Sequence, residues 1–149
     1  MTVYHITLGD GRTTEELVAA ASSGYCHSHV FSDDFPARLL NGETPREIVL
    51  LTFDRLVSSE EATAEAAKQG LKRPYYEDAL YFGSSTRRSS LVGPVAFLHY
   101  PSLGNHGRRD VICLWNNEGR HELDLEGFDD LWQPNYRLAF VRSAGESSE

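Results

Sequence analysis

The chain has 149 residues, a length typical of one domain, and 40% of them are hydrophobic, enough for a core without disulfide or metal support. Its formal net charge of −8, from 22 acidic and 14 basic side chains, argues against broad, non-specific nucleic-acid binding, which requires a concentrated positive field, but leaves room for a local basic loop. With two cysteines, no secretory signal and no apolar run of about 20 residues, we expect a cytoplasmic protein with free thiols that does not enter a membrane.

The first third of the chain predicts two strands and a helix. Residues 3–8 place a Tyr, an Ile and a Leu side chain on one face, which is typical of a short strand. Thr13 and Glu16 have the spacing of a capping box, so a helix is predicted to begin there and to end at Gly24. Residues 47–53 are apolar or β-branched at both odd and even positions, which predicts a strand buried on both faces.

The densest polar cluster lies in residues 25–34, whose start fits either a strand or an irregular segment. If the segment is extended, His27 and His29 share a face, which is how a strand presents two imidazoles to a metal ion. Asp33 or Asp34 would then add a carboxylate ligand. The spacing matches no established metal motif, so the alternative interpretation is a set of exposed polar side chains.

The middle of the chain predicts a helical hairpin. Ser58 and Glu61 again have capping-box spacing, which starts the first helix, and Gly70 sits where a left-handed residue would end it. Pro74 can open the second helix because the first helical position needs no N–H, and Gly83 can close it.

Four strand candidates occupy the C-terminal half, at residues 92–100, 110–116, 120–125 and 136–142. Their short connections favour an antiparallel meander. We therefore predict an α+β fold in which an antiparallel C-terminal sheet of four to five strands is covered on one face by the helical hairpin and the N-terminal helix. Residues 1–142 are expected to form one domain, followed by a flexible tail of residues 143–149.

Several different short motifs are distributed along nearly the whole chain. They comprise residues 13–17, Gly24-Tyr25, Phe35-Pro36, Ser58-Ser59-Glu60-Glu61, Gly70-Leu71, Pro74, residues 78–83, Gly107-Arg108-Arg109, Leu123, Leu125, Trp132 and residues 137–141. Their order resembles that of a family of small bacterial proteins of unknown function. The resemblance implies a single compact domain and no particular reaction.

A second group of polar residues falls on the predicted C-terminal strands and their loop. His99 and His121 with Arg108 and Arg109 would suit acid–base cleavage of a phosphodiester, since imidazole titrates near neutrality and arginine braces phosphate oxygens. No motif ensures that these side chains converge. The alternative is a hydrogen-bonded, partly buried His121 and a solvent-exposed arginine turn.

The leading interpretation is a small non-catalytic module that binds a protein or a small ligand, because no catalytic motif is present and no cofactor is indicated. Exposed aromatic residues would anchor the partner, since Tyr and Trp are enriched at interface hot spots. The candidates are Tyr75, Tyr76, Tyr81, Trp115 and Trp132. Two alternatives stay open: a phosphoester or nucleic-acid hydrolase using the second group, and a metal-binding protein centred on His27 and His29. For the binding module, a second copy of the chain is one candidate partner, which would give a homodimer.

Overall fold

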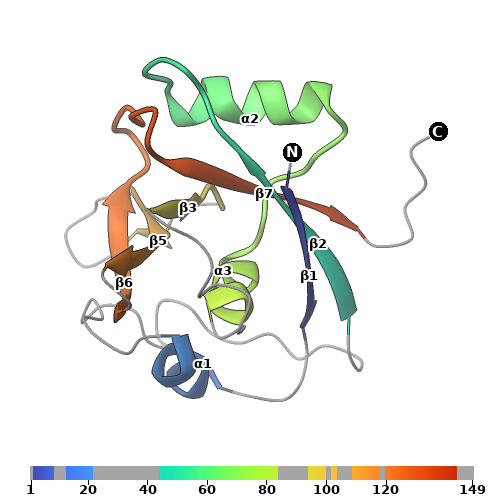
Figure 1. Ribbon diagram of the computed structural model, residues 1–149, viewed down its shortest axis with the longest axis vertical. Coiled ribbons are helices and arrows are strands. Elements are labelled where there is room, and N and C mark those ends of the chain that lie inside the picture. Colours follow the sequence, from blue (N-terminus) through green and yellow to red (C-terminus); the bar gives the residue numbers. More distant parts are fainter. Residues whose placement is uncertain are drawn as a thin grey trace.

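The computed structural model describes residues 2–8, 13–21, 44–83, 94–99, 102–103, 109–117 and 120–143. These residues form an α+β fold, which confirms the predicted class (Figure 1). The elements are β1 (Thr2–Leu8), α1 (Thr14–Ala21), β2 (Thr44–Leu51), α2 (Ser59–Lys68), α3 (Tyr76–Gly83), β3 (Val95–Phe97), β4 (Ser102–Leu103), β5 (Arg109–Asn117), β6 (Arg120–Gly127) and β7 (Arg137–Ser143). Ser143 belongs to β7, one residue beyond the predicted end of the domain, and residues 144–149 lie outside the described part. None of the described helices is long and apolar enough to span a membrane.

A single sheet of seven strands contains all of the described strands, in the order β1-β2-β7-β3-β5, with β4 and β6 also paired to β5. The prediction of four to five strands was therefore too low, because β1 joins β2 and the short β4 adds to β5. The predicted meander is also wrong at β7, which pairs with β2 and, in parallel, with β3. The reason is burial: four consecutive β7 residues, 138–141, are buried, which requires a central strand covered on both faces.

Strand β2 also lies in the middle of the sheet. Ile48 and Leu50 enter the core on one face, while Val49 and Leu51 enter a second core on the other. This alternation confirms the predicted burial of the strand on both faces, and it means that each face of the sheet needs a cover.

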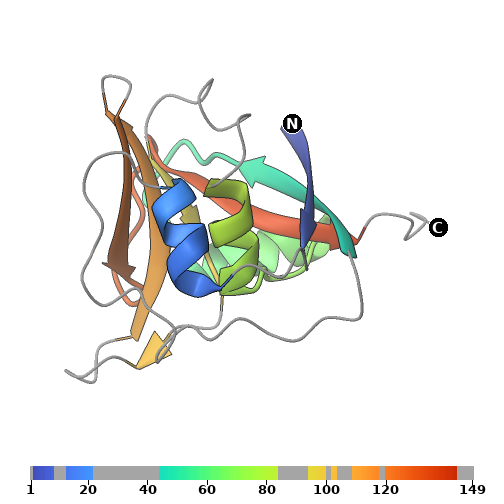
Figure 2. The same ribbon diagram turned by 90° about the horizontal axis from the view of Figure 1, so that it is seen from below.

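The helices provide those covers from opposite sides. Leu17 of α1 and Leu80 of α3 are fully buried in one core, whereas Ala62 and Ala66 of α2 belong to the other. Figure 2 shows α1 and α3 side by side in front of the sheet and α2 behind it. The predicted placement of all three helices on one face is therefore wrong for α2, since two apolar faces cannot be covered from one side.

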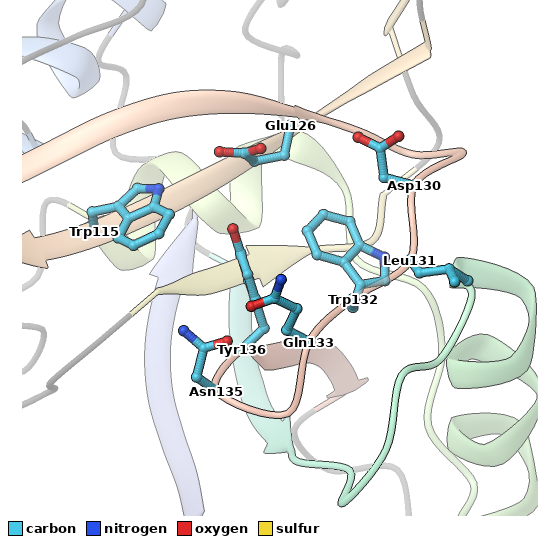
Figure 3. Close-up of a pocket in the computed structure, with 8 residues that line it drawn as sticks. All are labelled: Trp115, Glu126, Asp130, Leu131, Trp132, Gln133, Asn135 and Tyr136. Atoms are coloured by element: carbon cyan, nitrogen blue, oxygen red, sulfur yellow. The ribbon is translucent and has the colours of Figure 1, made fainter.

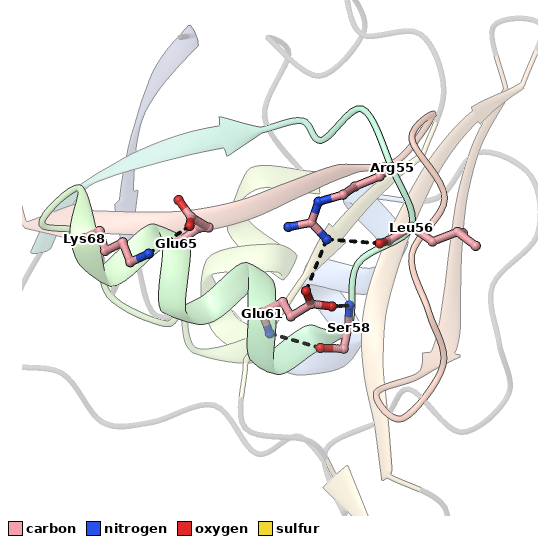
Figure 4. A network of polar contacts seen from close by, with 6 residues as sticks. All are labelled: Arg55, Leu56, Ser58, Glu61, Glu65 and Lys68. Atoms are coloured by element: carbon pink, nitrogen blue, oxygen red, sulfur yellow. Dashed lines mark hydrogen bonds and ion pairs between the residues drawn. The ribbon is translucent and has the colours of Figure 1, made fainter.

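Helices α1 and α2 begin at the predicted capping boxes. Thr13 Oγ1 accepts the N–H of Glu16 at 3.1 Å, and Glu16 accepts the N–H of Thr13 at 2.8 Å. Ser58 and Glu61 make the same two bonds, both 3.1 Å (Figure 4). The N–H of Ser58 and then the guanidinium of Arg55 lower the pKa of Glu61 below its ordinary value, so this acid is ionised when it caps the helix.

Helix α2 ends in the predicted left-handed residue. Gly70 has a φ of 76°, and its N–H donates to Ala67 O at 3.1 Å. The N–H of Leu71 then donates to Ala66 O at 2.9 Å. These two bonds define a Schellman motif, which reverses the chain direction.

The segment after Gly70 carries the chain from the α2 face of the sheet to the α3 face. Lys72 exchanges two backbone hydrogen bonds of 2.9 Å with Val141 of β7, beyond the end of β3. The guanidinium of Arg73 donates to Leu98 O at 3.0 Å and to His99 O at 2.8 Å. The linker thus fills the place in the sheet that β3 leaves open.

Replacing Gly70 with Ala should destabilise the protein. A Cβ at this position would meet no atom within 4 Å, so the cost arises from the left-handed backbone alone, about 1 kcal/mol. Urea unfolding would show a lower midpoint for Gly70→Ala, and Gly70→Asn should recover part of the loss because Asn tolerates this conformation better. Equal midpoints for the wild type and the Ala variant would contradict the assignment.

Candidate functional site

An aromatic cluster lies on the α2 face of the sheet, beside β5 and β6. The ring of Tyr136, just before β7, packs edge-to-face against Trp115 of β5 and Trp132, with centroids 5.8 and 5.1 Å apart. Trp132 is buried, while Trp115 and Tyr136 are part-exposed. The three rings border a pocket of about 190 Å³ (Figure 3).

The rest of the pocket lining is polar apart from one exposed leucine. Figure 3 shows the phenol oxygen of Tyr136 pointing toward Glu126, with Gln133 and Asn135 at the opposite end of the ring. Asp130 adds a second carboxylate, and Leu131, 57% exposed, forms part of the rim. None of the described residues that line this pocket is a lysine or an arginine.

Strand β6 extends the acidic surface. Its pairing with β5 puts Glu122 opposite Trp115 and Glu126 opposite Val111, with Asp124 between them. Directly paired residues of neighbouring strands share a face of the sheet. All three carboxylates therefore lie on the face that carries the aromatic cluster.

The charge of this region acts on the tyrosine hydroxyl. Burial raises the pKa of Tyr136 well above its ordinary value of 10.0, and the nearby Cys113, Glu126 and Asp124 raise it further. Residues 121–136 contain five acidic side chains and no lysine or arginine. The pocket is therefore strongly negative, and its phenol stays protonated as a hydrogen-bond donor near neutral pH.

Helix α2 fixes one wall of the pocket. Ser59, the first residue of α2, is fully buried; its Oγ donates to Phe128 O at 2.7 Å and accepts the indole N–H of Trp132 at 2.9 Å. Val57 and Trp132 also exchange backbone hydrogen bonds of 3.2 and 2.7 Å. The indole therefore has a fixed position, and the pocket is preorganised.

His99, a predicted catalytic residue, lies buried just after β3. Its Nε2 accepts the backbone N–H of Ile112 at 3.0 Å, and its ring lies 6.2 Å from that of Tyr76. The imidazole thus continues the pairing between β3 and β5 where the strand itself has ended. This contact gives His99 a structural role in holding β5.

The described backbone separates two other members of the predicted acid–base group. His121 pairs with Asn116 near one end of β5, whereas Arg109 stands at the other end, seven residues away along the strand. At about 3.3 Å per residue their backbone positions are about 23 Å apart along the strand. Arg108 lies outside the described residues, and the acid–base group as a whole stays a prediction.

The predicted metal ligands His27, His29 and Asp33 lie outside the described residues. Within the part of the chain that the structure describes, no group of three or more His, Cys, Asp or Glu side chains could hold a metal ion.

The five aromatic residues predicted as exposed anchors divide into three groups. Tyr75 is 45% exposed, as expected, whereas Tyr76 and Trp115 are part-buried. Tyr81 and Trp132 are buried, which corrects the prediction: Tyr81 enters the core under α3, and Trp132 packs below α2. The sequence signal for the pocket is the acidic run of residues 121–136, which carries Trp132 and Tyr136 near its end.

Comparisons with protein-family models, curated proteins and solved structures returned no match. The resemblance to a family of small bacterial proteins therefore stays a prediction. The site is interpreted from its own geometry.

Replacing Ser59 with Ala should loosen the pocket wall. The substitution removes the acceptor of the Trp132 indole and the donor to Phe128 O, which leaves two buried polar groups unsatisfied, at about 1–3 kcal/mol each. We expect a lower urea midpoint and a red-shifted tryptophan emission. Ser58→Gly is the neighbouring control, because glycine retains most N-cap stability; an equally small effect of both would contradict the role of Ser59.

Tyr136 should make the protein sensitive to alkali. The unfolded tyrosine releases its proton near pH 10, whereas the folded one retains it, so stability from this group is present below pH 10 and is lost as pH rises further. The melting temperature of the wild type should therefore fall more steeply between pH 10 and 11 than the melting temperature of Tyr136→Phe. Parallel curves for the two proteins would contradict the raised pKa.

Proposed function

We propose that this protein is a non-catalytic binding module of the bacterial cytoplasm and that its acidic aromatic pocket receives a lysine or arginine side chain of a partner protein. The observation that carries the proposal is that one pocket combines aromatic rings with carboxylates, while its described lining residues include no basic side chain. Aromatic faces attract cations through their quadrupole, and carboxylates hydrogen-bond to them. A reducing cytoplasm suits a buried cysteine such as Cys113.

The size of the pocket favours one side chain over a whole ligand. Its volume of about 190 Å³ falls below the range of about 300–1,000 Å³ that is usual for small-molecule sites. A long basic side chain is narrow enough to enter such a space, with its charged end at the carboxylates of Glu126 and Asp130.

The surroundings suit a protein partner. Leu131 and Leu56, 57% and 52% exposed, flank the strand-like pairing of Val57 with Trp132, and so offer apolar contacts beside the pocket. A cation over an aromatic ring contributes about 0.5–2 kcal/mol, so these leucines would supply a needed share of the affinity. The net charge of −8 would also speed encounter with a basic surface and make binding sensitive to salt.

Peptide binding tests this proposal. A Gly-Ser peptide with a central Arg-Leu pair should bind, and a change in tryptophan fluorescence should report the binding. The affinity should fall as sodium chloride is added. The same peptide with neutral citrulline in place of arginine should bind much more weakly. Equal binding of the two peptides would refute recognition of a cation.

A pair of matched variants locates the binding. Glu126→Gln removes a carboxylate of the pocket, while Glu60→Gln makes the same charge change on the exposed side of α2. We expect affinity for the arginine peptide to fall about five- to tenfold in Glu126→Gln and to stay nearly constant in Glu60→Gln. An equal loss in both would show that only the overall charge matters.

A further inference from the structure

Two of the longer strands lie at edges of the sheet. Among the described strands, β1 pairs only with β2, and β6 pairs only with β5. Figure 1 shows β1 and β6 on opposite sides of the sheet. An edge strand presents backbone N–H and C=O groups that can pair with another chain, unless charged side chains or other local features protect the edge.

Strand β6 is protected in this way. Three acidic residues alternate along it between positions 122 and 126, so a second copy placed there would bring carboxylates against carboxylates. Leu125 lies opposite Ile112, whose own N–H points away from β6 to His99, so the N–H of Leu125 points to the outer edge. Asp124 accepts this N–H at 2.8 Å, which occupies a donor that an added strand would need.

Strand β1 carries no such protection. Its sequence TVYHITL contains no aspartate, glutamate, lysine, arginine, proline or glycine. Thr, Val, Tyr and Ile favour strands, and a neutral segment of this composition pairs readily with another strand when its edge is open. His5 and Thr7 are exposed, while Ile6 and Leu8 anchor the strand in the core. The outer edge of β1 is therefore a fixed and unprotected template for a further strand.

We propose that β1 pairs with β1 of a second copy of this chain, antiparallel and about a twofold axis, so that the two sheets join into one. A twofold axis makes an edge strand complementary to itself. Pairing over all seven residues requires His5 to lie opposite its own copy, because His5 is the middle residue of the strand. The proposal is independent of the acidic aromatic pocket, which lies beside β5 and β6.

The residues that would meet in this register suit one another. Tyr4 would lie opposite Ile6 on one face of the joined sheet, and Val3 opposite Thr7 on the other. Aromatic and β-branched pairs of this kind stabilise antiparallel strands. The backbones would add about one hydrogen bond per residue, which gives about seven and lies within the range of about 5–15 for a usual protein interface.

Size-exclusion chromatography with light scattering tests the assembly at about pH 8, where histidine is mostly neutral and His5 would not repel its copy. We expect twice the mass of one chain at submillimolar concentration. The mass of a single chain under these conditions would overturn the proposal.

Cysteine cross-linking locates the axis. Opposite residues of antiparallel strands have Cα atoms about 4.5–5.5 Å apart, a distance that a disulfide can span. Thr7 and its copy would lie four positions out of register, about 13 Å apart. On exposure to air, His5→Cys should therefore form a disulfide-linked dimer at least about tenfold faster than Thr7→Cys, the matched variant on the same strand and face.

A double variant checks the register. Val3→Cys combined with Thr7→Cys should cross-link about as fast as His5→Cys, since each of these positions would face the other in the second copy. The wild type, with Cys26 and Cys113, gives the background rate. Equal rates for His5→Cys and Thr7→Cys, or a double variant no faster than Thr7→Cys alone, would show that the copies do not meet along β1 in this register.

Discussion

The two backbone hydrogen bonds between Lys72 and Val141 hold the point at which the chain passes from one face of the sheet to the other. Strands β2 and β7 are apolar on both faces, so neither face can remain in water; exposing Val49 and Phe140 alone would cost about 1.5–3 kcal/mol each. Helices α2 and α3 meet this requirement from opposite sides, although they follow one another directly. The crossing after Gly70 makes that arrangement possible, and the acidic aromatic pocket lies next to α2, which it helps to position.

Local chemistry in the sequence was sufficient for the ends of α2. Ser58, Glu61 and Gly70 make contacts with residues at most a few positions away, so their spacing alone predicts them. The faces covered by the helices depend on the whole sheet. The predicted burial of β2 on both sides already implied a cover on each face, and the prediction of one covered face overlooked this consequence. The parallel pairing of β7 with β3 had no local signal, because it joins segments separated by β4, β5 and β6.

The candidate site likewise combines features that the local sequence predicts with features that depend on the whole fold. The acidic run and the aromatic residues around Trp132 and Tyr136 are visible in the sequence, but the burial of Trp132 depends on Ser59, a residue far away along the chain. His99 illustrates the opposite case: a histidine on a predicted strand suggested catalysis, yet its ring serves as a backbone acceptor for Ile112. Residue type and spacing identify what a side chain can do, whereas its partner decides what it does.

Besides the acidic aromatic pocket, a pocket with the described basic lining residues Arg46, Lys72 and Arg73 lies near the other end of α2, a helix of about 15 Å. Acidic and basic side chains thus gather at opposite ends of this helix. Part of this separation serves folding: Glu60 and Glu61 at the N-terminus and Lys68 at the C-terminus complement the helix dipole, each by about 0.3–1 kcal/mol. Stabilising a dipole requires charge near a helix end, but neither a cavity nor an exposed ring. The part-exposed rings of Trp115 and Tyr136 are therefore features that helix stability leaves unexplained and that the proposed recognition of a cation would explain.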